Sequence, residues 1–187
     1  MKNINISIRE QRLTVAEGET PIRSYPVSTS RFGIGTEQGS MKTPTGRFRV
    51  AEKIGDDLPS DVVFQSRVPL KPGDPLPPTE DLVMSRILWL DGLDEHNANT
   101  RDRFIYIHGT KHEDKIGRPA SHGCIRMRNI DIVDLFKLDD EDAHVTIEEE
   151  TARSGDSKKM EKKALRPRSS PPKRWQQQPA EKGGEKE

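Results

Sequence analysis

The stretch "IYIHGTKHEDKIGRPASHGCIRMRN", from Ile105 to Asn129, concentrates the reactive side chains of this 187-residue chain. It holds three of the five histidines and the only cysteine, Cys124. Three interpretations are open at this point: the cysteine does chemistry, the histidines and the cysteine bind a metal, or these residues only pack together. The sequence on either side of the stretch narrows the choice.

Apolar and polar residues alternate through most of the first 150 positions, which is the pattern of half-buried β-strands. Residues 4–8 and 12–17 alternate in this way, and Gly18-Glu19 then turns the chain into residues 20–30. Short turns between consecutive strands predict an antiparallel meander. Further strands are predicted at residues 43–54, 82–93, 103–109 and 143–150. The third of these, residues 103–109, carries His108 near its end.

Two segments depart from the strand pattern. Asn129, a favourable N-cap residue, precedes Ile130, Val133 and Phe136 at helical spacing, which predicts one short amphipathic helix. The segment from Gly55 to Glu80 contains six prolines and two glycines, a density that predicts neither strand nor helix. A structureless loop of this length inside a compact domain is usually a lid, a binding loop or disordered.

The charge balance separates the chain into two parts. The net charge is zero, but residues 153–187 carry eleven Lys/Arg and five Asp/Glu, so residues 1–152 are acidic. The last segment is also polar and rich in proline, with too little apolar surface to offset the chain entropy lost on folding. We therefore predict a folded domain over residues 1–150 and a disordered basic tail over residues 151–187.

The same survey limits the possible classes of protein. One cysteine excludes an intrachain disulfide scaffold. The first thirty residues show no uninterrupted apolar region followed by a small-residue cleavage site, so no signal peptide is visible. No later segment approaches the roughly 18 consecutive apolar residues of a membrane-spanning helix. These features leave the cellular compartment open.

The residues around the cysteine are suited to acyl transfer. A thiol becomes a strong nucleophile when a base or a cation favours its deprotonation. His122 lies two residues before Cys124, and a loop of sixteen residues can bring His108 back against it. Gly123 lacks a side chain where backbone N–H groups would approach a developing oxyanion. Arg126 would suit a substrate carboxylate.

The two other interpretations are weaker but remain open on these grounds alone. A single cysteine in a sequence is more often a small buried hydrophobe than a nucleophile. His108, His112, His122 and Cys124 are all donors that zinc accepts, yet the chain has no C-x-x-C pair, and a cysteine flanked by Gly123 and Ile125 fits a zinc site poorly. We therefore expect no metal site.

The stretch from Ile105 to Asn129 resembles the catalytic signature of L,D-transpeptidases of the YkuD type. The resemblance rests on "IHGT" at residues 107–110 and on "IGRPASHGCIRM" at residues 116–127. Residues 11–50, "QRLTVAEGETPIRSYPVSTSRFGIGTEQGSMKTPTGRFRV", also resemble the opening strands of that family and its "TPTG" turn. The match extends roughly from Ile4 to Glu148.

The resemblance implies a mainly β fold, a YkuD-like β-sandwich catalytic domain with one or two short helices. It implies that Cys124 is the nucleophile and that His108 accepts and later donates the proton. Backbone N–H groups near the cysteine would form the oxyanion hole. The motif positions assigned to the oxyanion hole and to substrate binding are Ser121, His122, Gly123 and Arg126. No metal or organic cofactor is implied.

The family acts on peptidoglycan stem peptides, so the resemblance implies this substrate and a location in the periplasm or cell wall. The sulfur attacks the carbonyl of an L-centre, releases a terminal D-amino acid and passes the acyl group to an amine. Hydrolysis by an L,D-carboxypeptidase or endopeptidase, attachment to a protein lysine, and a non-catalytic wall-binding module are the alternatives. The basic tail would contact anionic wall polymer. "KRWQQQ" near Trp175 is too little to predict a nucleic-acid partner.

Overall fold

The computed structural model describes residues 2–138 and 143–150. The chain divides into one compact unit over Met1–Thr151 and a second over Ala152–Glu187, and the following concerns the first. The tail over residues 151–187 lies outside the described residues, so its predicted disorder stays a prediction. No helix among the described residues is long and apolar enough to cross a membrane.

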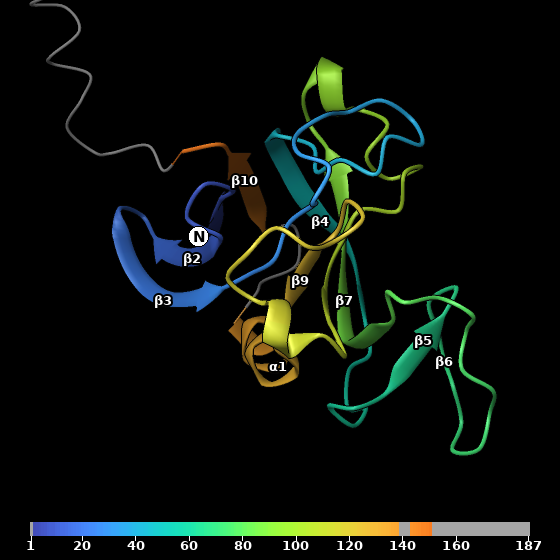
Figure 1. Ribbon diagram of the computed structural model, residues 1–187. Helices are drawn as coiled ribbons and strands as arrows, with labels where there is room; N and C mark the ends of the chain where they lie inside the picture. Colours follow the sequence, from blue (N-terminus) through green and yellow to red (C-terminus); the bar gives the residue numbers. More distant parts are fainter. Residues whose placement is uncertain (1, 139–142, 151–187) are drawn as a thin grey trace, which may run out of the picture. The chain divides into compact units, whose positions relative to one another are not determined.

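The described part of the chain is mostly β-structure, as the sequence predicts, and its strands form one large sheet (Figure 1). The strands are β1 Lys2–Ser7, β2 Arg12–Glu17, β3 Thr20–Pro26, β4 Gly46–Ile54, β5 Val63–Gln65, β6 Val68–Pro69, β7 Val83–Gly92, β8 Tyr106–Gly109, β9 Ile125–Met127 and β10 His144–Glu148. The helices are the short 3₁₀ segments η1 Glu95–Asn97 and η2 Glu113–Lys115 and the α-helix α1 Asn129–Leu138.

The strand order is β3-β2-β1-β10-β4-β7-β5-β6, and β8 and β9 extend from β7. The predicted meander is present, because β1 pairs antiparallel with β2 and β2 with β3. The last strand, β10, pairs parallel with β1 and antiparallel with β4. It thereby joins the N-terminal meander to the strands that carry the cysteine stretch.

The main core lies between the meander, the central strands and α1. Phe48, Leu88, Ile107 and Ile125 are completely buried in it. A smaller apolar cluster consists of Phe64, Ile87 and Tyr106, and Cys124 packs against it. The cysteine therefore lies at the boundary between the sheet and the segment that contains β5.

The segment from Gly55 to Glu80 is more ordered than predicted. Its short stretch without proline, around Val63 and Phe64, forms β5 and pairs with the start of β7. β5 also pairs with β6, so the segment contains a hairpin, the β5–β6 hairpin, which projects at the lower right of Figure 1. The prolines lie outside the paired stretch or at its edge, where a missing N–H costs no ladder hydrogen bond.

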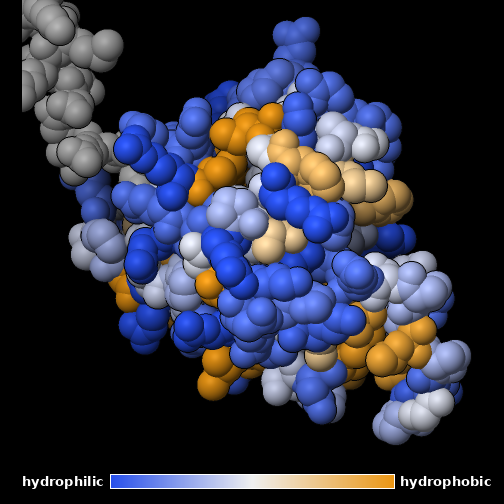
Figure 2. Space-filling model, in the orientation of Figure 1, coloured by the Kyte–Doolittle hydropathy of each residue, from blue (hydrophilic) through white to orange (hydrophobic). Residues whose placement is uncertain are grey.

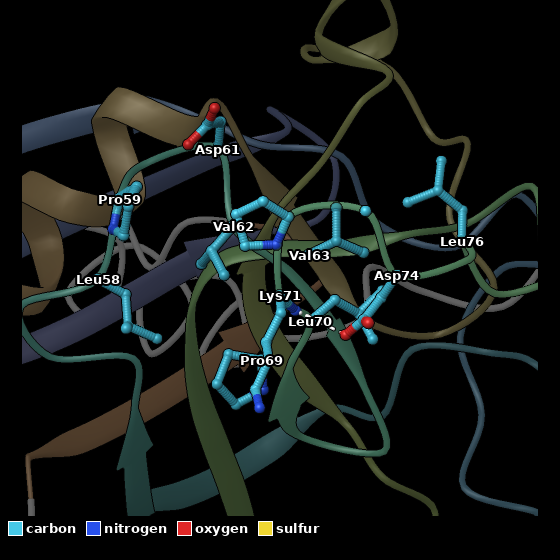
Figure 3. Close-up of a pocket in the computed structure, with 12 residues that line it drawn as sticks. Leu58, Pro59, Asp61, Val62, Val63, Pro69, Leu70, Lys71, Asp74 and Leu76 are labelled. Atoms are coloured by element: carbon cyan, nitrogen blue, oxygen red, sulfur yellow. Dashed lines mark hydrogen bonds between the residues drawn. The ribbon is translucent and has the colours of Figure 1, made fainter.

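This segment, the hairpin included, lines an open apolar cavity of about 620 Å³. Apolar surface is visible over the β5–β6 hairpin at the lower right of Figure 2. Lys71 N–H donates to Asp74 Oδ2 at 2.8 Å and closes the turn beside the cavity (Figure 3). The apolar lining is formed by Leu58, Pro59, Val62, Val63, Pro69, Leu70, Pro72 and Leu76.

Helix α1 forms where the sequence predicts it, but two details of the prediction are wrong. The buried face consists of Ile132, Leu135 and Phe136, whereas Ile130 is 74% exposed. Positions 132, 135 and 136 form the i, i+3, i+4 set that packs against β7 and β8. The Asn129 side chain does not act as the N-cap, because its amide nitrogen donates to Thr110 O at 3.1 Å and its Oδ1 has no partner.

The orientation of α1 can be tested with a matched pair of substitutions. We expect Ile132→Ala to lower the free energy of unfolding by about 2–5 kcal/mol, because it empties a fully buried site. Ile130→Ala should change it by less than about 0.5 kcal/mol, because the side chain is exposed. Denaturant unfolding of both variants measures the difference. A larger loss for Ile130→Ala than for Ile132→Ala would mean that α1 packs through the face predicted from the sequence.

Candidate active site

The parallel pairing of β8 with β9 brings the two ends of the cysteine stretch together. Ile107 lies opposite Ile125, and His108 lies opposite Arg126. Both isoleucines are fully buried in the main core. Because side chains alternate between the two faces of a strand, His108 and Arg126 project from the other face. Cys124 directly precedes β9 on that same side.

The neutral ring of His108 is held in a single tautomer by the neighbouring residue. Its Nδ1 lies 2.6 Å from the carbonyl oxygen of Gly109, and a carbonyl oxygen can only accept a hydrogen bond. The proton is therefore on Nδ1, and Nε2 keeps its lone pair. The ring is 1% exposed, and this burial lowers the pKa of His108. A neutral imidazole with a free Nε2 can act as a base.

The thiol of Cys124 is partly exposed and is held by the backbone of the strand that leads to His108. The N–H of Tyr106 donates to Sγ at 3.4 Å, and the thiol donates to the carbonyl of Phe104 at 3.3 Å. Burial raises the pKa of Cys124 to about 12, although the Tyr106 N–H and the cations Arg126 and Arg103 oppose this. The thiol form is therefore favoured at neutral pH in this geometry.

A tight turn immediately precedes the cysteine and requires glycine. Gly123 has φ +125°, a backbone conformation that residues with a side chain rarely adopt. The hydroxyl of Ser121 donates to the carbonyl of Cys124 at 2.5 Å and accepts from the N–H of Gly123 at 3.3 Å. Thr43, in the TPTG turn, donates to the carbonyl of Gly123 at 2.9 Å. The two quoted sequence motifs thus meet in space at this turn.

The turn leaves two backbone donors available. The N–H of Gly123 is bound to Ser121, as described above, whereas the N–H groups of His122 and Cys124 have no hydrogen-bond partner within residues 2–138 and 143–150. Unpaired N–H groups beside a sulfur are what a developing oxyanion needs. The turn therefore offers two backbone donors where the sequence predicts an oxyanion hole, and the oxyanion role itself stays a prediction; Gly123 shapes the turn and its own N–H is bound to Ser121.

Asp81 is a residue of the site that the sequence did not suggest. Its Oδ2 accepts from Arg126 Nη2 at 2.5 Å and from His122 Nδ1 at 3.2 Å. Burial alone would raise the pKa of Asp81, but the charges of His108 and Arg126 and its hydrogen bonds lower that pKa overall. It follows a segment that reads as a loop, with no motif around it, so only the fold connects it to the cysteine stretch.

The imidazole of His122 is occupied on both sides. Nδ1 donates to Asp81, and Nε2 lies 2.9 Å from Nη2 of Arg31, which can only donate. Its ring also lies 5.9 Å from the ring of Phe32. Both ring nitrogens of His122 therefore have hydrogen-bond partners, whereas Nε2 of His108 has none among the described residues. This difference distinguishes the two histidines.

The ion pair between Asp81 and Arg126 is buried and only partly satisfied. Arg126 is 2% exposed. Among the described residues, its Nε and Nη1 and the Oδ1 of Asp81 have no hydrogen-bond partner. Each such unpaired group costs about 1–3 kcal/mol unless something else binds it.

Within residues 2–138 and 143–150, no group of three or more His, Cys, Asp or Glu side chains could hold a metal. His112 instead lies 2.8 Å from the carbonyl of Glu80.

Comparison with known proteins supports the family resemblance and the fold. The model of the L,D-transpeptidase catalytic domain family, YkuD, matches residues 2–147. The YkuD protein of Bacillus subtilis is 25% identical over 145 residues, which is 78% of this chain and 65% of that protein. The YqjB protein of Bacillus subtilis is 28% identical over 134 residues, 72% of this chain and 67% of that protein.

Solved structures share the fold at lower sequence identity. An L,D-transpeptidase of Xylanimonas cellulosilytica superposes with a TM-score of 0.53 at 19% identity, over 79% of this chain and 60% of that one. L,D-transpeptidase 3 of Mycobacterium tuberculosis, in complex with a faropenem-derived adduct, gives 0.51 at 18% identity over the same shares. The chain thus spans about two thirds or less of the length of these relatives.

The resting state of the thiol is directly testable, because the chain contains one cysteine. We expect the rate of alkylation of Cys124 by iodoacetamide to rise throughout the range from about pH 8 to about pH 10, since burial raises its pKa to about 12. In denaturant the rate should level off above the ordinary thiol pKa of about 8.5. Intact-mass measurement follows both reactions. Levelling below about pH 8.5 in the folded protein would mean that the site holds a thiolate at rest.

Proposed function

The chain belongs to the L,D-transpeptidase catalytic domain family, and on this premise we propose that it is a cysteine L,D-transpeptidase of peptidoglycan stem peptides. The observation that carries the proposal is the pairing of β8 with β9. It places a histidine with a free Nε2 and the only cysteine on the same side of two adjacent strands. Two unpaired backbone N–H groups lie beside that cysteine.

The first half of the reaction forms an acyl-enzyme. Nε2 of His108 takes the thiol proton as Sγ of Cys124 attacks the carbonyl carbon of the donor peptide, so no thiolate is needed before substrate binds. The N–H groups of His122 and Cys124 stabilise the oxyanion. The C–N bond then breaks, and His108 gives its proton to the departing D-amino acid. The product is a thioester on Cys124.

The second half transfers the acyl group. His108 takes a proton from the acceptor amine as this amine attacks the thioester carbon, and then returns the proton to sulfur as the C–S bond breaks. The thiol and the neutral imidazole are restored. Asp81 acts through other residues: it fixes the Arg126 guanidinium and the His122 ring. The free N–H groups of Arg126 would contact a substrate oxygen.

The experiment that tests this function is incubation of the full chain with muropeptides, followed by mass spectrometry of the products. We expect cross-linked or exchanged peptides together with released D-amino acid. Cys124→Ala should abolish both products, because no nucleophile remains. Release of the D-amino acid without any transfer would reassign the protein as an L,D-carboxypeptidase. Wild-type turnover by Cys124→Ala would contradict the cysteine mechanism.

A β-lactam offers an independent readout of the same nucleophile. The Mycobacterium tuberculosis structure holds a faropenem-derived adduct, and the family resemblance points to carbapenems as acylating agents. A carbapenem should therefore add one adduct per chain on Cys124, because the opened ring leaves an acyl group on sulfur. Intact-mass measurement with Cys124→Ala as the control decides whether the adduct is specific.

The two histidines should differ in their effects on activity. His108→Ala should slow acyl-enzyme formation by about 100-fold or more, since it removes the base. His122→Ala should cost less, because its backbone N–H remains. In the wild type, kcat/KM should fall as the pH drops through the lowered pKa of His108, below its ordinary value of about 6.5, because protonation removes the Nε2 lone pair. The opposite ranking of the two variants would make His122 the base.

A further inference from the structure

A cation and three aromatic rings form a cluster between the β5–β6 hairpin and the start of β8; we call Arg67, Trp89, Phe104 and Tyr106 the cation–aromatic cluster. The guanidinium carbon of Arg67 lies 4.5 Å from the Trp89 ring centre and 5.4 Å from that of Phe104. Nη1 of Arg67 also donates to the Tyr106 hydroxyl at 3.2 Å. The indole of Trp89 contacts the other two rings, at 5.9 Å and 5.8 Å between centres.

The cluster adjoins the sulfur of Cys124. The two residues that contact Sγ through their backbones, Phe104 and Tyr106, are the same two whose rings lie against Arg67 and Trp89. A peptide whose carbonyl carbon is at Sγ would therefore have this cluster among its first neighbours. A single residue of extended chain spans about 3.3–3.6 Å, so a group one or two residues from the scissile bond is within reach of the cluster.

The charge of Arg67 is not compensated by a carboxylate. Within residues 2–138 and 143–150 no Asp or Glu pairs with it, although it is half-buried against the rings. The neighbouring cations differ. Arg126 is paired with Asp81, and Arg101, which lies over the same indole at 4.9 Å, is paired with Glu52 at 3.8 Å. Arg67 therefore has no carboxylate partner among the described residues and is available to bind an anion from outside the protein.

The hairpin holds Arg67 in a fixed position through a strained backbone turn. Ser66 and Arg67 form its two-residue turn with φ of 49° and 70°, a conformation that favours glycine or asparagine. A residue with a side chain adopts this conformation only at an energetic cost. Contacts of the Arg67 side chain with Trp89, Phe104 and Tyr106 help to hold the turn. The guanidinium is therefore positioned before any ligand arrives, so little side-chain entropy is lost when it binds.

We propose that Arg67 binds a carboxylate of the acyl-donor peptide, so that the β5–β6 hairpin is a specificity element of the site. This inference rests on the proposed function for the identity of the peptide. A guanidinium offers five N–H donors in a planar fork that matches a carboxylate, and Tyr106 uses one nitrogen. The rings beneath it exclude water, which strengthens such a pair. The terminal carboxylate of the D-residue and a side-chain carboxylate are the two sources.

Binding to the full chain carrying Cys124→Ala tests the proposal without requiring turnover. Three forms of a donor tetrapeptide with a terminal D-residue are titrated by calorimetry: the free acid, the C-terminal amide and the side-chain amide. We expect Arg67→Gln to weaken binding of the free acid by about 10- to 100-fold, as for loss of a charged hydrogen-bond pair. For the amide that lacks the bound carboxylate, Arg67→Gln should have less than about a twofold effect, which identifies the source.

Arg101→Gln is the matched control. It removes a second cation from the same indole, but one that Glu52 already neutralises at an exposed position. It should weaken binding of the free acid by less than about threefold. Equal weakening of all three peptides by Arg67→Gln would show that Arg67 only holds the hairpin in place. That result, or binding of none of the peptides to the Cys124→Ala chain, would overturn the proposal.

Turnover by the chain with Cys124 intact separates this inference from the proposed function. If the inference holds, Arg67→Gln should lower kcat/KM for the free acid mainly through KM, with carbapenem acylation changed less. Selective binding of the acid without any turnover would refute the transpeptidase activity and keep the carboxylate site. Turnover of acid and amides with the same dependence on Arg67 would refute the carboxylate site and keep the activity.

Discussion

The parallel pairing of β8 with β9 is the constraint on which the rest of the site depends. Parallel neighbours cannot be joined by a tight hairpin and need a crossover of about a dozen residues or more. The separation of sixteen positions from His108 to Cys124 is therefore a geometric requirement as well as a motif spacing. The crossover also carries Ser121, whose hydroxyl braces the turn before the cysteine. The pairing thus sets His108 and the sulfur on one side of two adjacent strands, with the turn at Gly123 just before the sulfur.

The site is neutral at rest, and this shapes how it can work. Burial raises the pKa of Cys124 and lowers that of His108, so neither group is charged near neutral pH. The buried charges nearby, Asp81 and Arg126, compensate each other. A neutral pair avoids the large cost of an unpaired buried charge. In the proposed reaction, proton transfer to His108 is coupled to attack on the substrate, and the resting thiol reacts slowly with other electrophiles.

The proline-rich segment is joined to this site more closely than its composition indicates. It contributes the β5–β6 hairpin, whose Phe64 packs in the same small apolar cluster as Tyr106 and Cys124. Asp81 follows directly after the segment, between it and β7, and binds Arg126. A change in the length of this segment would therefore act on the site through two routes. One is the cation–aromatic cluster around Arg67, and the other is the buried ion pair.

The sequence by itself determined the mainly β fold and the meander, and it predicted Cys124, His108 and the turn before the cysteine as the site. Strand periodicity and the two local motifs carry that information, because they depend on neighbours within a few residues. Asp81 and Arg67 could not be found in this way, since each acts on partners tens of residues away and neither lies in a motif. The buried face of α1 and the pKa shift of Cys124 were likewise decided by packing. Both depend on which surfaces the tertiary structure removes from water, and local sequence does not specify that.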